Sequence, residues 1–381
     1  MKKLALLLLI SIFSITAKPI ALSDSLRVSL LTVSAGEELY SVFGHTAIRI
    51  TDLKNGYDIA FNYGTFDFST PNFYLKFALG GLDYMISVEN YQGFVDFYKQ
   101  ENRTVIEQEL NFDKEQRLKL ASLLINNYLP ENRFYRYKFF TDNCSTRIRD
   151  ILSTASGDSL LLVRPEIDAN VTYHKLYTSR LSSMPWAKFG IGFLLGSLTN
   201  QESKNNALFL PDNLMKAVDI ATLNNKPLAV SKRLIFVATP PAKEHTLFTP
   251  TVLAIIILSL SVLIQFKLAW IITYDKVFFA IMGFFGIFVS ILSVFSQHAE
   301  LHYNYVILFL LPTNIILSFL PTTSLVRKYY IIIAFILSFI GLVSLRLIPQ
   351  TFNFAFLLIA FSVALRLFFN FAPALINRFQ K

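Results

Sequence analysis

The single cysteine of the chain, Cys144, stands among polar residues in the segment Thr-Asp-Asn-Cys-Ser-Thr-Arg at 141–147. Asp142 or Asn143 is a natural N-cap, and the apolar spacing that follows predicts a helix to about Leu152. Unpaired backbone N–H groups and the helix dipole stabilise a thiolate in a first helical turn. We therefore expect Cys144 to be a nucleophile, the alternative being the small buried side chain that most free cysteines are.

A thiol nucleophile needs a base, and histidine is the usual one because of its pKa. The part of the chain before the apolar third has three histidines, His45, His174 and His245. His174 follows a polar loop and His245 lies beside the predicted membrane, which are settings of ordinary surface residues. His45 follows Gly44 at the start of a predicted strand, where a glycine permits close approach and a strand holds the ring rigidly. We predict His45 as the base; a polar residue at a strand end is the alternative.

A third group would have to orient the imidazole. The Asn-Gly dipeptide at 55–56 predicts a two-residue hairpin turn, and pairing about it places Asn62 on the same face as His45. Asn62 could accept a hydrogen bond from the ring and fix its tautomer, although Asp67 is a rival and a simple turn-forming role is an equal alternative. Candidates for oxyanion or substrate binding are Asn143, Ser145, Gly44, Tyr63, Asp67 and His298.

The elements that must position these residues are read from periodicity and turn residues. Alternating apolar residues predict strands, and 3.6-residue spacing predicts helices. The expected strands are 27–33, 45–51 and 57–63, the expected helices are 114–128 and 144–152, and 133–140 is expected to be extended. No internal repeat or low-complexity tract interrupts this α+β pattern.

Composition divides the 381 residues near residue 248, with nearly all acidic residues before it and Ile, Leu, Phe and Val dominating after it. Five stretches after this point are long and apolar enough to cross a bilayer, and the basic residues between them favour a cytoplasmic C-terminus. The predicted spans are 250–267, 277–296, 305–321, 329–347 and 352–371. We thus expect an all-α bundle of five transmembrane helices at 249–372 and a cytoplasmic tail at 373–381.

The N-terminus reads as an export signal. A positive start is followed by a short apolar stretch and by Ile-Thr-Ala at 15–17, which suits signal peptidase. We predict a cleaved signal peptide at 1–17 and an exported domain at 18–240; an uncleaved anchor is the alternative, disfavoured because the stretch is short for a span.

The formal charge of +9 does not indicate a nucleic-acid partner. Much of the surplus sits at membrane edges, where it sets orientation and meets anionic lipid, and no basic tract is interleaved with aromatics. One cysteine permits no intrachain disulfide. His298, Glu300 and His302 could in principle bind a metal, but no third histidine or cysteine ligand is evident, so a polar loop is preferred and no metal or cofactor is expected.

A strand-borne Gly44-His45 that precedes a helix-borne Asn143-Cys144 resembles the circularly permuted branch of the NlpC-type papain-like fold, which includes lecithin:retinol acyltransferase. More closely, the chain resembles the bacterial membrane-protein family that has an Lnb-type N-terminal periplasmic domain and is implicated in lipoprotein N-acylation. The matching segments are 36–49, 62–68, 135–137, 142–147, 209–212 and 296–298, with Asn304 and Pro312.

This resemblance implies a periplasmic papain-like (permuted NlpC-like) domain on a multi-pass protein of the bacterial inner membrane. It implies Cys144 as nucleophile and His45 as base, while Asn62 stands where relatives often have a second histidine. The implied reaction moves an acyl chain from a phospholipid donor, through a thioester, to the N-terminal amine of a diacylated lipoprotein. An NlpC-like peptidase or amidase acting on cell-wall peptides and a non-catalytic binding module with a membrane anchor are the alternatives.

Overall fold

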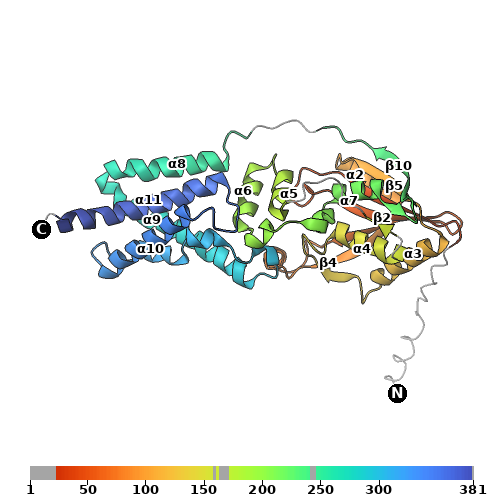
Figure 1. The fold of residues 1–381 in the computed structure, drawn as a ribbon, viewed down its shortest axis with the longest axis horizontal. Helices are drawn as coiled ribbons and strands as arrows, with labels where there is room; N and C mark the ends of the chain where they lie inside the picture. Colours follow the sequence, from red (N-terminus) through yellow and green to blue (C-terminus); the bar gives the residue numbers. More distant parts are fainter. Residues whose placement is uncertain (1–22, 158–159, 163–170, 241–245, 380–381) are drawn as a thin grey trace, which may run out of the picture.

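The computed structural model describes residues 23–157, 160–162, 171–240 and 246–379. An N-terminal domain built on a sheet occupies one end of the elongated molecule and a helical bundle the other (Figure 1). The predicted signal peptide at 1–17 and His245 lie outside the described residues.

The N-terminal domain is built on a seven-stranded antiparallel sheet with strand order β10-β5-β1-β2-β3-β4-β6. The three strands expected from alternation are confirmed within two residues at their ends. The strands are β1 (Arg27–Val33), β2 (His45–Asp52), β3 (Tyr57–Thr65), β4 (Asp83–Asn90), β5 (Val105–Leu110), β6 (Phe134–Arg136) and β10 (Ala229–Phe236). Of the extended segment expected at 133–140, only β6 is a strand. A second, three-stranded sheet consists of β7 (Leu160–Leu161), β8 (Thr222–Leu223) and β9 (Lys226–Pro227).

The hairpin between β2 and β3 differs from the prediction in its turn. Asp52 pairs with Tyr57, so the loop has the four residues 53–56 rather than two. The Asp52 carboxylate accepts a hydrogen bond from the Asn55 side chain at 2.9 Å and so bridges the loop. The shift of register is by an even number of residues, and side chains alternate faces with a period of two. Asn62 therefore still lies on the His45 face.

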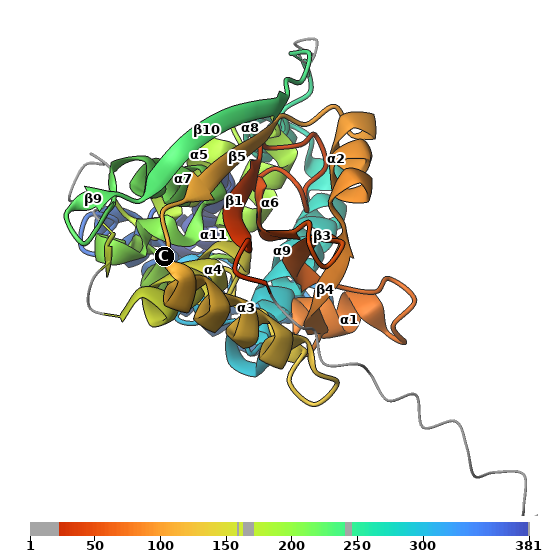
Figure 2. The ribbon, with the colours of Figure 1, turned by 90° about the vertical axis from the view of Figure 1, so that its right-hand side faces the viewer.

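Helices cover both faces of the sheet (Figure 2). On one face, α3 (Lys114–Tyr128), α4 (Cys144–Ser156) and α7 (Pro211–Ile220) pack on the side chains of alternate strand residues such as Ile48 and Phe61. On the other face, α2 (Tyr91–Gln100) packs on the small side chains of Ala47 and Ala60. The predicted helix at 114–128 is confirmed, and α4 runs four residues beyond its predicted end.

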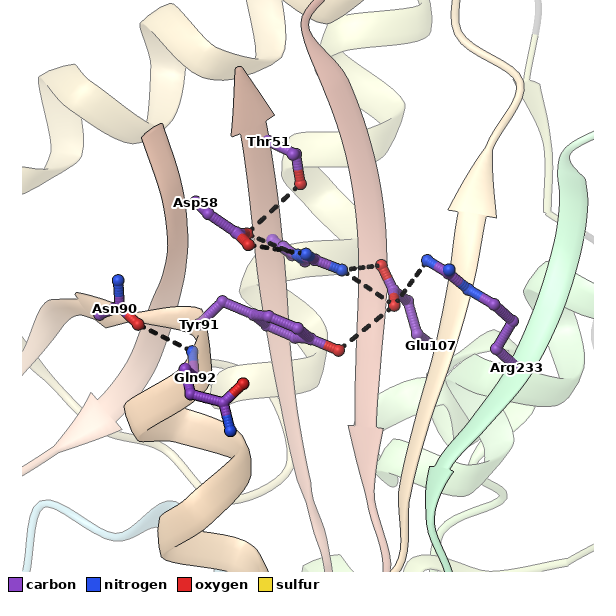
Figure 3. A network of polar contacts seen from close by, with 8 residues as sticks. Thr51, Asp58, Asn90, Tyr91, Gln92, Glu107 and Arg233 are labelled. Carbon is purple, nitrogen blue, oxygen red and sulfur yellow. Dashed lines mark hydrogen bonds and ion pairs between the residues drawn. The ribbon is translucent and has the colours of Figure 1, made fainter. Parts of the chain in front are cut away.

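A charged network fastens α2 to the sheet (Figure 3). Arg49 on β2 makes two hydrogen bonds to Asp58 on β3, at 2.7 and 2.8 Å, and another to Glu107 on β5 at 2.9 Å. Its guanidinium carbon lies 3.4 Å from the ring centroid of Tyr91 on α2. Arg233 on β10 also donates to Glu107, whose side chain is only 2 % exposed. The contacts of the Glu107 carboxylate and the Arg49 guanidinium thus link four strands and one helix.

We expect Arg49→Met to destabilise the protein by roughly 3 kcal/mol, because removal of one partner leaves the other charges of a buried network uncompensated. This loss corresponds to a fall of about 5 to 10 °C in the thermal midpoint, measured on the full chain in detergent. Arg27→Met, at an exposed position of β1, is the matched control and is expected to change the midpoint little. Equal midpoints for the two variants would contradict a role for the network in stability.

The C-terminal region contains three helices long and apolar enough to cross a membrane: Ala269–Phe295, Leu325–Val343 and Phe354–Phe371. A pair of short helices, 299–308 and 312–318, passes the same test only as one span bent by 42°, and the apolar helix at 250–266 is shorter. Five spans therefore remain a prediction. The long helices are α8 (Pro250–Leu263), α9 (Leu268–Phe295), α10 (Leu325–Val343) and α11 (Phe354–Phe379).

The predicted bundle differs from the structure in its details. Lys276, which lies between the spans predicted at 250–267 and 277–296, is inside α9, and α11 continues to Phe379, so most residues of the expected tail are helical. The expected span at 305–321 consists of short 3-10 segments, one of which starts at Pro312, a residue that lacks the N–H an α-helix needs. Gly286 of α9 leaves no room for a Cβ beside the Leu310 carbonyl, so the broken segment packs backbone to backbone against that helix.

Hydrogen bonds to main-chain carbonyls join the N-terminal domain to the helical bundle. The end of α6 (Pro185–Leu194) is capped from the bundle, where Asn304 Nδ2 donates to the carbonyls of Phe193 and Leu194 at 3.0 and 2.9 Å. The Gly196 N–H donates to the Glu300 carbonyl at 2.8 Å. The remaining helices of the N-terminal domain are α1 (Phe73–Ala78) and α5 (Tyr173–Arg180). The domain is thus docked on the loop that follows α9.

Candidate active site

Cys144 is the first residue of α4, and the local sequence explains why the helix starts there. The Asn143 side chain accepts from the Thr146 N–H at 2.9 Å, and the Thr146 hydroxyl accepts from the Asn143 N–H at 2.8 Å, which forms a capping box. The Asn143 amide also donates to the carbonyls of Phe139 and Phe209, both at 2.8 Å. Every polar atom of this side chain is occupied, so Asn143 holds the helix start.

His45 is the first residue of β2, and Gly44 allows the chain to turn into the strand. Gly44 has φ +83°, and a Cβ there would stand 2.8 Å from the Val33 carbonyl oxygen. A side chain at this position would be both strained and crowded. The predicted need for glycine before the histidine therefore has a structural cause in the turn.

The helix start and the strand start meet directly. The Cys144 sulfur accepts a hydrogen bond from the backbone N–H of Thr46, the residue that follows His45. Beside this contact the hydroxyls of Thr46 and Ser145 lie 2.9 Å apart, both fully buried. Among the hydrogen bonds of the described residues none joins the sulfur to the His45 ring itself. The thiol thus touches the backbone next to the histidine.

A chain of polar groups continues from His45 across the sheet. His45 Nε2 lies 3.1 Å from Asn62 Oδ1 on β3, and Asn62 Nδ2 donates to Glu89 Oε1 on β4 at 2.8 Å. The structure therefore gives Asn62, and not Asp67, the contact with the imidazole. Asp67 instead accepts from the backbone and side chain of Ser69 in an exposed turn.

This chain determines which ring nitrogen can act as a base. An ionised carboxylate only accepts hydrogen bonds, so Glu89 fixes the orientation of the Asn62 amide, with Nδ2 towards Glu89 and Oδ1 towards His45. The Asn62 oxygen accepts, so His45 Nε2 must carry the proton. In a neutral imidazole the other nitrogen, Nδ1, is then unprotonated and can take a proton.

Burial shifts the pKa values of His45 and Cys144 in the directions that favour their neutral forms. It lowers the pKa of His45 to about 4; the hydrogen bond with Asn62 opposes this shift, and the positive charge of Arg103 adds a smaller lowering. Burial also raises the pKa of the Cys144 thiol above its ordinary value, in spite of hydrogen bonds from Thr46 and Ser145 to the sulfur. The expectation that the helix start would favour a thiolate is wrong, because desolvation is the larger effect. Burial therefore favours a neutral thiol at Cys144 and a neutral imidazole at His45.

Alkylation of Cys144 by iodoacetamide is expected to reflect this neutral pair. The rate should rise steadily with pH through pH 9 and show no plateau near neutrality, because only the thiolate reacts and burial raises its pKa. Cys144 is the single cysteine, so the mass of the intact chain measures its modification. A constant fast rate between pH 5 and 8 would instead show a preformed thiolate–imidazolium pair.

The start of α4 supplies backbone donors at the Cys144 sulfur. The backbone N–H groups of Cys144 and Ser145 point at the sulfur, whereas the next one in the helix, that of Thr146, is taken by Asn143. Donors of this kind, fixed at a helix start, stabilise the charge of a tetrahedral intermediate. The Ser145 hydroxyl also hydrogen-bonds the sulfur and lies 2.9 Å from the Thr46 hydroxyl.

The other predicted candidates have structural contacts. The Tyr63 hydroxyl accepts from Asn127 Nδ2 at 2.7 Å, and burial raises the pKa of Tyr63 to about 12. His298 Nε2 lies 2.9 Å from the Phe77 carbonyl oxygen, and His302 Nε2 lies 2.8 Å from that of Ser296. These rings therefore fasten the loop after α9 to its surroundings. Within the described residues no three His, Cys, Asp or Glu side chains are grouped to hold a metal.

Glu89 is the residue that sequence reasoning missed. Its strand, Asp-Tyr-Met-Ile-Ser-Val-Glu-Asn at 83–90, was not among the strands expected from alternation. Asn62 pairs with Ser87, so Glu89 lies two residues along on the same face. Glu89 could have been found only if β4 had been predicted as the neighbour of β3. That pairing joins segments separated by a helix and a loop.

Comparisons with protein families agree with the two-part architecture. Residues 20–180 match the Lnb N-terminal periplasmic domain, and residues 242–376 match the Lnb transmembrane domain. Comparison with curated proteins and with solved structures found no significant match. The two matched domains contain Cys144, His45 and Asn62 in one and the apolar helices in the other. The chain is therefore a membrane protein of the Lnb family, with its periplasmic domain first and its transmembrane domain second.

Proposed function

We propose that this protein is a thiol-dependent acyltransferase of the bacterial inner membrane. It moves an acyl chain from a phospholipid, through a thioester on Cys144, to the N-terminal amine of a diacylglyceryl-cysteine lipoprotein. The observation that carries the proposal is the meeting of the Cys144 helix start with the strand start at His45, whose ring is oriented by Asn62. Membership of the Lnb family, whose members are tied to lipoprotein processing at the membrane, supports it.

In the first step the sulfur of Cys144 attacks the ester carbonyl carbon of the phospholipid, and His45 Nδ1 takes the thiol proton. The carbonyl oxygen becomes an oxyanion that the N–H groups of Cys144 and Ser145 stabilise. When the C–O bond breaks, Nδ1 returns the proton to the departing glycerol oxygen. The products are an acyl thioester and a lysophospholipid.

In the second step the free amine of the lipoprotein attacks the thioester carbonyl. His45 Nδ1 removes a proton from the attacking amine and gives it to the departing sulfur, so Cys144 returns as a thiol. A neutral imidazole suits both steps, because each begins with the acceptance of a proton. The lowered pKa of His45 keeps the ring in that form at neutral pH.

The membrane position of the domain favours lipid substrates over soluble cell-wall peptides. The domain is docked on the loop after α9 by backbone hydrogen bonds at Gly196 and by Asn304. Both proposed substrates reside in the bilayer, and a site held at its surface searches two dimensions. A peptidase acting on cell-wall peptides would not need this docking.

The test is to trap the thioester. The full chain is reconstituted with phospholipid carrying a labelled acyl chain, denatured rapidly, and examined by intact mass and by label on the peptide that contains Cys144. We expect one acyl group per chain that hydroxylamine removes, and transfer of the label to a diacyl lipopeptide as an amide. Absence of a hydroxylamine-sensitive adduct, or an adduct on another residue, would refute the proposal.

Glu89 is expected to act as a positioning residue through Asn62. Glu89→Met should slow thioester formation by roughly tenfold, because the Asn62 amide loses the acceptor that fixes its orientation. Glu89→Gln retains an acceptor oxygen but adds an NH₂ donor, so it should recover part of the rate. If Glu89 only stabilises the fold, the thermal midpoint should fall in parallel with the rate of thioester formation. Equal rates for Glu89→Met and Glu89→Gln would exclude the orienting role.

A further inference from the structure

The short helix α1 lies against the end of a membrane span. The Gln297 N–H donates to the Leu79 carbonyl at 2.8 Å, and the Ser296 hydroxyl donates to that of Ala78 at 3.1 Å. Residues 296–297 follow directly on the span Ala269–Phe295. Three main-chain carbonyls at the C-terminal end of α1, including that of Phe77 beside His298, are thus held at the C-terminal end of α9.

This helix exposes apolar side chains beside the end of a candidate membrane span. None of its six residues is buried, and Tyr74, Leu75 and Phe77 are 80, 61 and 50 % exposed. Phe295, the last residue of the span, is exposed as well. Exposed aromatic and aliphatic side chains beside a span end are the composition of interfacial membrane contacts, where the ring and the apolar stem enter the lipid.

A row of rings leads from this helix to the thiol. Phe77 stacks 6.3 Å from Phe73, Phe73 lies 5.7 Å from Phe66, and Phe66 lies 5.3 Å from Tyr84. Tyr84 stacks on Tyr137 with centroids 4.5 Å apart. A Cβ built on Gly64 would lie 3.3 Å from the Tyr137 ring and 3.9 Å from the Cys144 Cβ, so the last ring and the thiol flank one glycine.

We propose that α1 enters the periplasmic leaflet and that the row of rings above it is the path by which phospholipid acyl chains reach Cys144. The occupant is lipid, because the helix is held at the end of a membrane span. The entry of α1 into the leaflet is inferred from contacts and exposure alone. The path along the row of rings rests on the proposed acyl transfer, and it explains how an apolar substrate reaches a thiol that is only 7 % exposed.

The depth of α1 is tested without any activity. A nitroxide is attached at position 75 in the full chain carrying Cys144→Ser and Leu75→Cys, reconstituted in phosphatidylcholine vesicles, and its collisions with oxygen and with a polar nickel complex are compared. The matched control is Leu53→Cys in the β2–β3 loop, also a leucine and 68 % exposed. We expect greater oxygen and smaller nickel accessibility at 75 than at 53. Equal accessibilities would overturn the proposal.

The path is tested by comparing two acyl donors. Leu75→Asp should slow acylation of Cys144 by vesicle phospholipid roughly tenfold, since an apolar contact with lipid is lost, and leave acylation by a water-soluble short-chain ester unchanged. Leu53→Asp should change neither rate. An equal fall for both donors, or no fall for either, would overturn the path. Failure of the parent protein to accept any phospholipid would refute the proposed function and leave the depth measurement valid.

Discussion

Replacement of Cys144 with serine is expected to abolish acyl transfer, with a loss of at least about 10³-fold in the rate of product formation. A serine hydroxyl is a far weaker nucleophile than a thiol and cannot form a thioester that an amine attacks readily. The change is nearly isosteric, and the hydrogen bonds that the Thr46 N–H and the helix start make to this position can be retained. The measurement is the amide product formed from labelled phospholipid and a diacyl lipopeptide.

The control for this variant is its fold. We expect the thermal midpoint of Cys144→Ser to stay close to that of the parent, because the capping box of Asn143 and Thr146 does not involve the thiol. Cys144→Ala should be equally inactive. Product formed by either variant at the parental rate would remove Cys144 from the mechanism.

The second large effect is expected for His45→Gln, which should slow thioester formation by roughly 10³-fold. General acid–base catalysis contributes about 10²- to 10⁴-fold, and glutamine has no nitrogen that accepts a proton at neutral pH. The matched control is His174→Gln, in the same domain but on α5, which should leave the rate unchanged. Equal losses for the two variants would contradict the assignment of His45 as the base.

The pH dependence of the parent enzyme follows from the same residue. The base must be unprotonated, and burial lowers the pKa of His45 to about 4. Protonation therefore removes the base only as the pH falls through about 4, and the rate of thioester formation should be nearly constant from pH 5 to 8. An acid limb centred near 6.5, the ordinary pKa of histidine, would show that the imidazole is solvated when it acts.

Several features of the site were predictable from local sequence. The spacing around 141–152 predicted a helix that starts at Cys144, and alternation at 45–51 predicted a strand that starts at His45. The face shared by His45 and Asn62 was predicted although the turn was not, because a shift of two residues preserves the side of the sheet. These features depend on hydrogen bonding and periodicity within a few residues, which the sequence carries directly.

Other features were decided only by segments far apart in the chain. The pKa of the thiol depends on how much of the domain covers it, and this burial reversed the direction expected from the helix start alone. Glu89 and Phe209 come from distant segments, so neither the orientation of Asn62 nor the full occupation of Asn143 could be derived locally. By itself the sequence singled out Cys144 and His45 as candidate residues and indicated a membrane region. The tertiary structure decided their protonation, their orientation and the docking of α1 on a span, because desolvation and long-range pairing exist only once the chain is packed.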